Sequence, residues 1–156
     1  MQKYYSKRVL KKIASAADYH DLLSVAMAII RAMYHEHPFK PIAMVCGPIS
    51  TGGRGSKNEN LKVFSRAIDR LSADGLFIFS QMPFEDGMGR IFNSDPKLQG
   101  NVLLEEFYLP IFGSGLIKLL YFLPGWENSI GATWKHEQAK KLNIPIVYLA
   151  DCYIND

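Results

Sequence analysis

The 156-residue chain contains only two cysteines, too few for a disulfide scaffold. Cys46 and Cys152 lie in apolar, strand-like runs without a CxxC or Cys/His pattern. We therefore expect two reduced cysteines in the core, which is typical of a cytoplasmic protein. The four histidines are scattered, and the His35-x-His37 pair has no matching acidic or cysteine partner to complete a metal site, so we expect structural or surface roles and no metal site.

Long apolar runs are also missing. No run approaches the roughly 20 residues that a membrane-spanning helix needs, and the start MQKYYSKR lacks the apolar segment of a signal peptide. The chain is therefore expected to be cytoplasmic and to have no membrane partner.

A strong excess of charge is absent as well. Eighteen basic and 15 acidic residues leave a net charge of +3, which is milder than the charge typical of nucleic-acid-binding domains. The basic residues among the first dozen positions predict a solvated helix face rather than an anion-binding arm. We expect no nucleic-acid partner, and the composition, 48% hydrophobic and 21% charged, is that of a globular protein.

What is present is an alternation of strand and helix patterns. Residues 1–38 are predicted to form an N-terminal helical extension, whose second helix follows Asp18 and ends at His37-Pro38. Residues 39–156 are predicted to form one α/β domain. Its strands are expected at 41–46, 76–80, 116–123 and 144–150, its helices at 58–73, 99–113 and 132–142, and its loops at 47–57, 81–98 and 124–131.

This alternation predicts parallel strands joined by right-handed crossovers. The economical arrangement is a flavodoxin-like, doubly wound parallel sheet of order 2-1-3-4. Such sheets bind ligands where the strand order reverses, here between the first and third strands. Loops 47–57 and 124–131 follow these two strands, so the sequence predicts a binding site where the two loops meet.

The first loop, with the sequence GPISTGGRGSK, is suited to an anion. Its glycines let backbone N–H groups approach a ligand, and its side chains add donors. The predicted ligand-binding residues of this loop are Gly47, Pro48, Ser50, Gly52, Gly53 and Arg54. It is neither a Walker A loop nor a GxGxxG dinucleotide loop, and no flavin loop is recognisable, so we expect no cofactor. The alternative is a flexible surface loop.

The second loop, with the sequence PGWENSIG, precedes a predicted helix. Ser129 and Gly131 lie just before this helix, whose N-terminal amides favour a phosphate. Trp126 either stacks on a base or covers the end of the sheet. Gly125, Trp126, Ser129 and Gly131 complete the predicted ligand-binding set.

Residues 41–150 resemble the nucleoside 2-deoxyribosyltransferase-like superfamily, which includes deoxynucleoside 5′-monophosphate N-glycosidases. The resemblance is carried by a strand that ends in Gly47-Pro48 and by LPGWENSIGA, followed by a helix and the strand IPIVYL. It looks like an uncharacterised branch of bacterial and phage proteins with a Leu-Pro-Gly-Trp-x-x-Ser-x-Gly-Ala signature. The resemblance implies a nucleoside or nucleotide ligand and a homodimer or larger homo-oligomer.

The resemblance also implies a reaction. Its members cleave the N-glycosidic bond through a glutamate on the helix after Ser-x-Gly, which attacks the anomeric carbon and forms a glycosyl-enzyme intermediate. This follows the logic of retaining glycosidases, in which a carboxylate stabilises a cationic sugar and then bonds to it.

This chain departs from that pattern at the nucleophile. Six residues after Ser129, where the branch carries the glutamate, stands Lys135. The nearest carboxylate, Glu137, lies about 200° around the helix from Lys135. Lys135 shares a stripe with Ala139 and Leu142 that is predicted to face the sheet, so Glu137 is predicted to point away. Glu106, from the preceding predicted helix, is another candidate acid.

Three functions remain open at this point. The chain is an N-glycosidase or deoxyribosyltransferase that uses Glu137 or another carboxylate. Alternatively, it is a nucleotide-binding pseudoenzyme or sensor without the nucleophile, or an unrelated flavodoxin-like binding protein. The apolar face of residues 22–33 is a candidate dimer interface, although packing within the chain would explain it equally well.

Overall fold

The computed structural model describes residues 2–156 and contains a four-stranded parallel sheet of order β2-β1-β3-β4. This confirms the predicted fold class, including the helices that precede the sheet. The strands are β1 (Ile42–Cys46), β2 (Phe77–Ile78), β3 (Ile117–Phe122) and β4 (Ile146–Tyr148). Each strand is shorter than predicted, because the hydrogen-bonded pairing with neighbouring strands covers only part of each apolar run.

The chain divides into two compact units. The sheet unit consists of Pro41–Ser80 and Ile117–Asp156. The helical unit consists of Gln81–Leu116 and the described part of Met1–Lys40. Residues 81–116 therefore group with the N-terminal helices.

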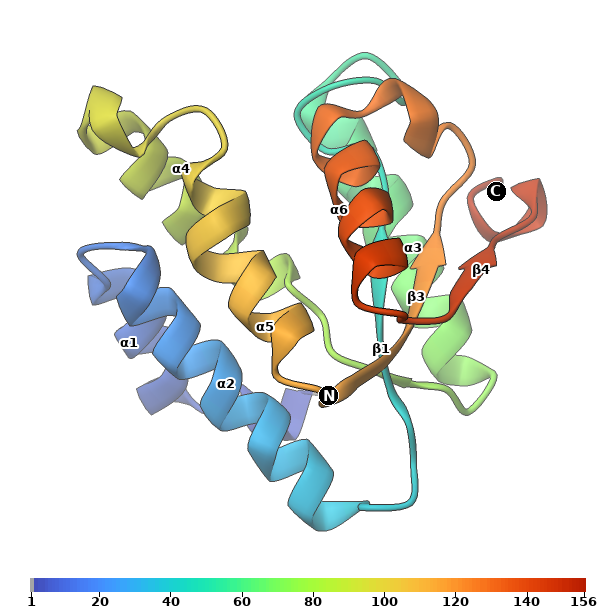
Figure 1. Cartoon of the computed structure of the whole chain (residues 1–156), viewed down its shortest axis with the longest axis horizontal. Coiled ribbons are helices and arrows are strands. Elements are labelled where there is room, and N and C mark those ends of the chain that lie inside the picture. Colours follow the sequence, from blue (N-terminus) through green and yellow to red (C-terminus); the bar gives the residue numbers. More distant parts are fainter. Residues whose placement is uncertain (1) are drawn as a thin grey trace. The chain divides into compact units, whose positions relative to one another are not determined.

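In the sheet unit, one helix covers each face of the sheet. α3 (Lys57–Ala73) lies behind the strands and α6 (Ile130–Lys141) in front of them (Figure 1). Every residue of β1 is buried, as a central strand covered on both faces requires. The apolar stripe of α3 completes the core on its side, with Phe64, Ala67 and Leu71 fully or almost fully buried.

The helical unit begins with η1 (Gln2–Tyr4), α1 (Lys7–Ser15) and α2 (Tyr19–Glu36). Asp18 caps α2 as predicted, since its side chain accepts a hydrogen bond from the Asp21 N–H. The residues of the apolar face of α2 that are buried are Leu22, Ala26, Met27, Ile29, Ile30 and Met33. They pack against helices of the same unit, so this face is covered within the chain and is not free to form a dimer interface.

The segment 81–98, predicted as a loop, contains η2 (Met82–Phe84), α4 (Glu85–Ser94) and η3 (Pro96–Leu98). Gly87 and Gly89 lower the helix propensity of α4, which explains the wrong prediction. Tertiary packing reverses that preference. A Cβ on Gly87 would lie 3.3 Å from the Leu22 side chain, a tight contact, and 3.5 Å from the Ile13 carbonyl, an ordinary one, so α4 packs closely against α1 and α2 at this position.

The segment 99–113, predicted as one helix, contains the π-helix η4 (Leu104–Tyr108) and then α5 (Leu109–Gly113). After β3, the chain forms η5 (Trp126–Asn128), and η6 (Asp151–Tyr153) follows β4. Cys46 is buried as predicted, whereas Cys152 is exposed. The prediction for Cys152 was wrong because β4 ends at Tyr148, which leaves Cys152 in a 3-10 turn.

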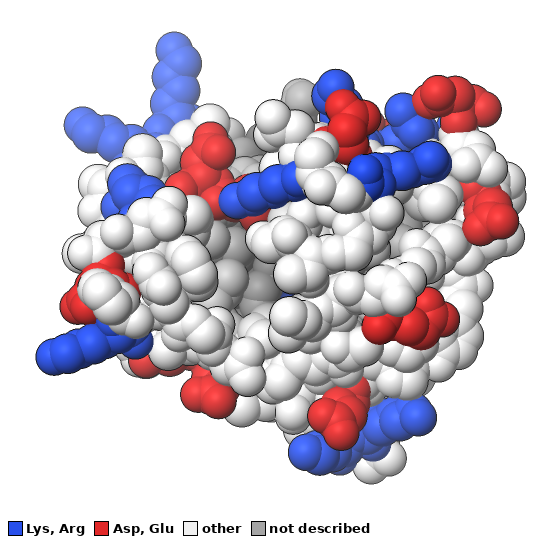
Figure 2. Space-filling model, turned by 90° about the horizontal axis from the view of Figure 1, so that it is seen from above, with Lys and Arg blue, Asp and Glu red and all other residues white. Residues whose placement is uncertain are grey.

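None of the helices formed by residues 2–156 combines the length and apolarity needed to cross a membrane. On the face shown in Figure 2, Lys and Arg side chains alternate with Asp and Glu, and neither sign forms a continuous patch.

Candidate functional site

Loops 47–57 and 124–131 meet at the carboxyl ends of β1 and β3. The Thr51 hydroxyl accepts a hydrogen bond of 3.0 Å from the Ile130 N–H. A Cβ on Gly47 would lie 2.7 Å from Leu123, and one on Gly52 would lie 2.6 Å from the Asn128 carbonyl oxygen. The absence of side chains at Gly47 and Gly52 therefore allows close contact between the first loop and the segment that follows β3.

Asn60, in the first turn of α3, holds the first loop in shape. It is 3% exposed. Its Oδ1 accepts a 2.7 Å hydrogen bond from the Arg54 N–H, and its Nδ2 donates to the carbonyls of Ile49 (2.8 Å) and Gly52 (3.1 Å). A buried amide that satisfies three backbone groups makes the loop an ordered structure rather than a flexible surface loop.

A cavity of about 310 Å³ opens between the two loops. From the first loop and α3 it is lined by Pro48, Gly53, Arg54, Asn60 and Val63, and from the remainder of the sheet unit by Leu123, Pro124, Gly125, Asn128 and Ile154. We call it the loop cavity. Its lining residues include one cation, Arg54, and no carboxylate.

Arg54 is exposed, and no carboxylate among the described residues pairs with its guanidinium. Gly53, next to it, has φ +64°, and a Cβ there would meet Asn60 Oδ1 at 2.4 Å and Pro48 at 2.7 Å. The backbone that presents Arg54 therefore requires glycine at position 53.

The N-terminus of α6 uses most of its donors within the protein. Ser129 is the N-cap residue, 4% exposed, and its hydroxyl accepts from the Ala132 N–H. The Ile130 N–H is engaged by Thr51. Gly131 lies inside the first turn, because α6 begins two residues earlier than predicted. Ser129 thus lies at the predicted place, where it stabilises the helix start.

Lys135 lies on the buried face of α6 and Glu137 on the exposed face. Lys135 is 4% exposed. The pKa of the Cys46 thiol is raised to about 11, because burial raises it by more than the nearby Lys135 lowers it. Lys135 is therefore buried, as the helical stripe predicts, but it is not among the residues that line the loop cavity. Ala139 shares the buried face, whereas Leu142 is 40% exposed because α6 ends at Lys141.

Glu106 belongs to the helical unit, where it lies in η4. Burial, and to a smaller extent the Glu106 carboxylate, raises the pKa of the Tyr19 hydroxyl, which donates a hydrogen bond to the Leu98 carbonyl. Glu106 thus interacts electrostatically with Tyr19, a residue of the same helical unit.

Trp126 takes part in an aromatic cluster with Phe122, His136 and Tyr148. The indole stacks on the His136 ring at 4.1 Å between centroids and 17° between planes. His136 Nε2 and the Tyr148 hydroxyl are 2.5 Å apart. A second cavity of about 310 Å³ borders this cluster, lined by Phe122, Leu123, Pro124, Trp126, Glu127, Tyr148 and Leu149. We call it the aromatic cavity.

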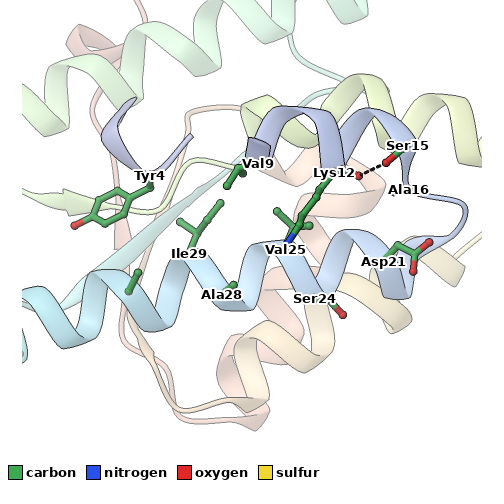
Figure 3. Close-up of a pocket in the computed structure, with 11 residues that line it drawn as sticks. Tyr4, Val9, Lys12, Ser15, Ala16, Asp21, Ser24, Val25, Ala28 and Ile29 are labelled. Carbon is green, nitrogen blue, oxygen red and sulfur yellow. Dashed lines mark hydrogen bonds between the residues drawn. The ribbon is translucent and has the colours of Figure 1, made fainter. Parts of the chain in front are cut away.

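A larger cavity, of about 540 Å³, lies in the helical unit between α1 and α2. Figure 3 shows Val9 and Lys12 extending from α1 toward Val25 and Ile29 of α2. Its lining mixes small and aliphatic side chains with polar ones, among them Lys12 and Asp21. None of its described lining residues comes from loops 47–57 or 124–131, where the sequence predicts the binding site.

Sequence reasoning missed Asn60 and the pair His136 and Tyr148. Asn60 carried a signal, since it occupies the same helical stripe as Phe64 and Leu71, and a polar residue within an apolar stripe indicates a buried hydrogen-bonding role. The partnership of His136 and Tyr148 had no such signal, because it joins a helix to a strand. The described residues contain no group of three or more His, Cys, Asp or Glu side chains that could hold a metal ion.

Comparison with known proteins gives one family match. A family model described as "Domain of unknown function (DUF4406)" matches residues 43–148, from β1 to β4. No curated protein and no solved structure matches the chain significantly.

Proposed function

We propose that this chain, which belongs to the DUF4406 family of domains of unknown function, binds a nucleotide in the loop cavity without cleaving it. The observation that carries the proposal is the lining of this cavity, which combines an unpaired guanidinium and the two amides of Asn60 and Asn128 with apolar side chains and has no carboxylate among its described residues. A cavity of about 310 Å³ has the size of a small-molecule site.

The charge of the lining favours an anion. Arg54 provides a planar, bidentate donor that matches a phosphate group. The apolar side chains of Val63, Leu123 and Ile154 supply part of the wall, which suits the less polar part of a nucleotide. Because Asn60 already orders the loop, little conformational entropy remains to be lost on binding.

The missing carboxylate argues against cleavage. The superfamily that the chain resembles needs a carboxylate to stabilise and then attack the cationic sugar. At the corresponding position stands Lys135, which offers no carboxylate to stabilise the developing positive charge and is not among the residues that line the loop cavity. Glu137 lies on the exposed face of α6 and does not line the loop cavity.

Calorimetric titration with deoxynucleoside 5′-monophosphates tests binding. We expect binding to the wild-type chain and a dissociation constant at least tenfold higher for Arg54→Ala, because a hydrogen bond to a charged group contributes about 1.5–3 kcal/mol. Lys141→Ala, which removes an exposed cation at the other end of α6, is the control and should leave the affinity unchanged. Equal affinities for wild type and Arg54→Ala would rule out phosphate binding at the loop cavity.

Measurement of free base tests the absence of cleavage. We expect no base release above background from the wild-type chain, and release from Lys135→Glu, which restores a carboxylate at the position of the superfamily nucleophile. A covalent sugar adduct on residue 135 of that variant should be visible by mass spectrometry. If the wild-type chain releases base and Glu137→Gln abolishes the release, the chain is an N-glycosidase and the binding-only proposal is wrong.

A further inference from the structure

We infer that the aromatic cavity holds the base of the bound nucleotide, with the base stacked on Trp126 and its amino edge hydrogen-bonded to Glu127. This inference rests on the proposed function, since it names the part of the nucleotide that lies beyond the phosphate. The loop cavity and the aromatic cavity share the lining residues Leu123 and Pro124 and are therefore adjacent.

One face of the Trp126 indole is covered from within the protein. His136 stacks on the indole, and the Tyr148 ring lies within 20° of the indole plane at 5.9 Å. The centroids of His136 and Tyr148 are 5.8 Å apart. Rings stacked on opposite faces of an indole would be about 7 Å apart, twice the contact distance of roughly 3.5 Å. His136 and Tyr148 therefore form one layer against the same face.

Part of the indole surface borders the aromatic cavity. Trp126 is partly exposed and lines this cavity together with Tyr148, which is 57% exposed. Phe122 is fully buried and packs edge-on against the indole at 5.4 Å and 68°. A partly exposed indole, held in place by His136 and Tyr148, is the kind of aromatic surface on which nucleic-acid bases stack in other proteins.

The negative charge of Glu127 in the aromatic cavity should make some bases bind more tightly than others. Glu127 is the only charged residue in its lining, and an ionised carboxylate accepts hydrogen bonds without donating them. It therefore favours a base that presents adjacent N–H groups. Guanine offers its ring N1–H and its 2-amino group side by side, which a carboxylate accepts as a bidentate pair. Hypoxanthine differs from guanine only by the loss of the 2-amino group and measures that contribution directly.

The experiment uses the intrinsic fluorescence of Trp126. Because the chain has only two tryptophans, Trp134→Phe leaves Trp126 as the single reporter. We expect deoxyguanosine 5′-monophosphate to quench this fluorescence and to bind about tenfold more tightly than deoxyinosine 5′-monophosphate. Glu127→Gln should reduce this preference to within about twofold, whereas Glu137→Gln, an exposed carboxylate outside the cavity, should preserve it.

The outcomes separate this inference from the proposed function. If calorimetry detects nucleotide binding that neither quenches Trp126 nor changes its base preference in Glu127→Gln, the inference is overturned and the proposed function stands. If deoxyguanosine without phosphate quenches Trp126 as tightly as the monophosphate does, and Arg54→Ala has no effect, the base site stands and the proposed phosphate site fails. Absence of any binding overturns both. Glu127 is exposed, so its variant reports on binding rather than on folding.

Discussion

At the scale of single residues, the site depends on side chains that support the backbone rather than on those that face the ligand. The Asn60 side chain forms hydrogen bonds with three backbone groups of the first loop that secondary structure does not pair. Gly53 lets that loop pack against Asn60 and Pro48. Only Arg54 projects a charge into the cavity lining. The backbone position of Arg54 is therefore set by an amide in the neighbouring helix.

Removing the Asn60 side chain tests this dependence. Asn60→Ala should lower the free energy of unfolding by about 2–4 kcal/mol, because three hydrogen bonds of roughly 1 kcal/mol each are lost in a buried place. It should also weaken nucleotide binding. Urea denaturation followed by calorimetry measures both effects.

Asn58→Ala is the matched control for Asn60→Ala, since Asn58 is exposed on the same helical turn. Its effect should stay within about 0.5 kcal/mol. Equal effects of the two substitutions would show that the loop does not depend on the Asn60 amide.

At the scale of elements, the two loops and the start of α6 form one hydrogen-bonded assembly. Ser129 caps α6 from within the second loop, and Thr51 reaches across from the first loop to the Ile130 N–H. The helix N-terminus that the sequence offered to an anion is thus largely occupied by hydroxyl groups. This is why the proposed phosphate partner is Arg54 rather than the α6 amides.

Thr51→Val removes the hydrogen bond between the loops while keeping the shape of the side chain. We expect the free energy of unfolding to fall by about 0.5–1.5 kcal/mol and nucleotide affinity to decrease, because the loops lose their mutual alignment. Thr51→Ser keeps the hydroxyl and should behave like the wild type in thermal denaturation and calorimetry. A Thr51→Val variant as stable as Thr51→Ser would mean that the glycine contacts alone hold the loops together.

At the scale of the whole molecule, stability should respond to pH through His136. Burial and the nearby Lys140 lower the pKa of this histidine, and Glu127 raises it. In the unfolded chain the pKa returns to about 6.5. As pH falls below that value, the unfolded chain takes up a proton at this position before the folded chain does, so the folded state loses stability until the pH reaches the lower, folded pKa.

The predicted observation is a melting temperature that declines between neutral and mildly acidic pH. His136→Gln should flatten that part of the profile, because the titrating group is gone. His20→Gln, at an exposed position on α2, should leave the decline in place. If His136→Gln and wild type show parallel profiles, another group controls this range.

The family match spans residues 43–148 and so includes segments of both compact units. The helices α1 and α2 lie outside the match, yet they pack with residues 81–116, which lie inside it.

The sequence by itself determined the parallel sheet, its order and the meeting of loops 47–57 and 124–131. The spacing of hydrophobic residues and the alternation of strands with helices can be read from neighbouring residues in the sequence. Because crossovers between parallel strands are right-handed, few arrangements of these elements remain. It also determined that Lys135 and Glu137 lie on different faces of α6, since helical geometry requires this. α4 was decided by tertiary structure, because contacts with α1 and α2 outweigh the low helix propensity of its glycines.

The same holds for the hydrogen bonds of Asn60 and Thr51 and for the layer formed by His136 and Tyr148. Each joins residues that are between 6 and 79 positions apart in the chain. Such contacts depend on the distances at which helices and strands finally pack, and no local pattern of residues records those distances.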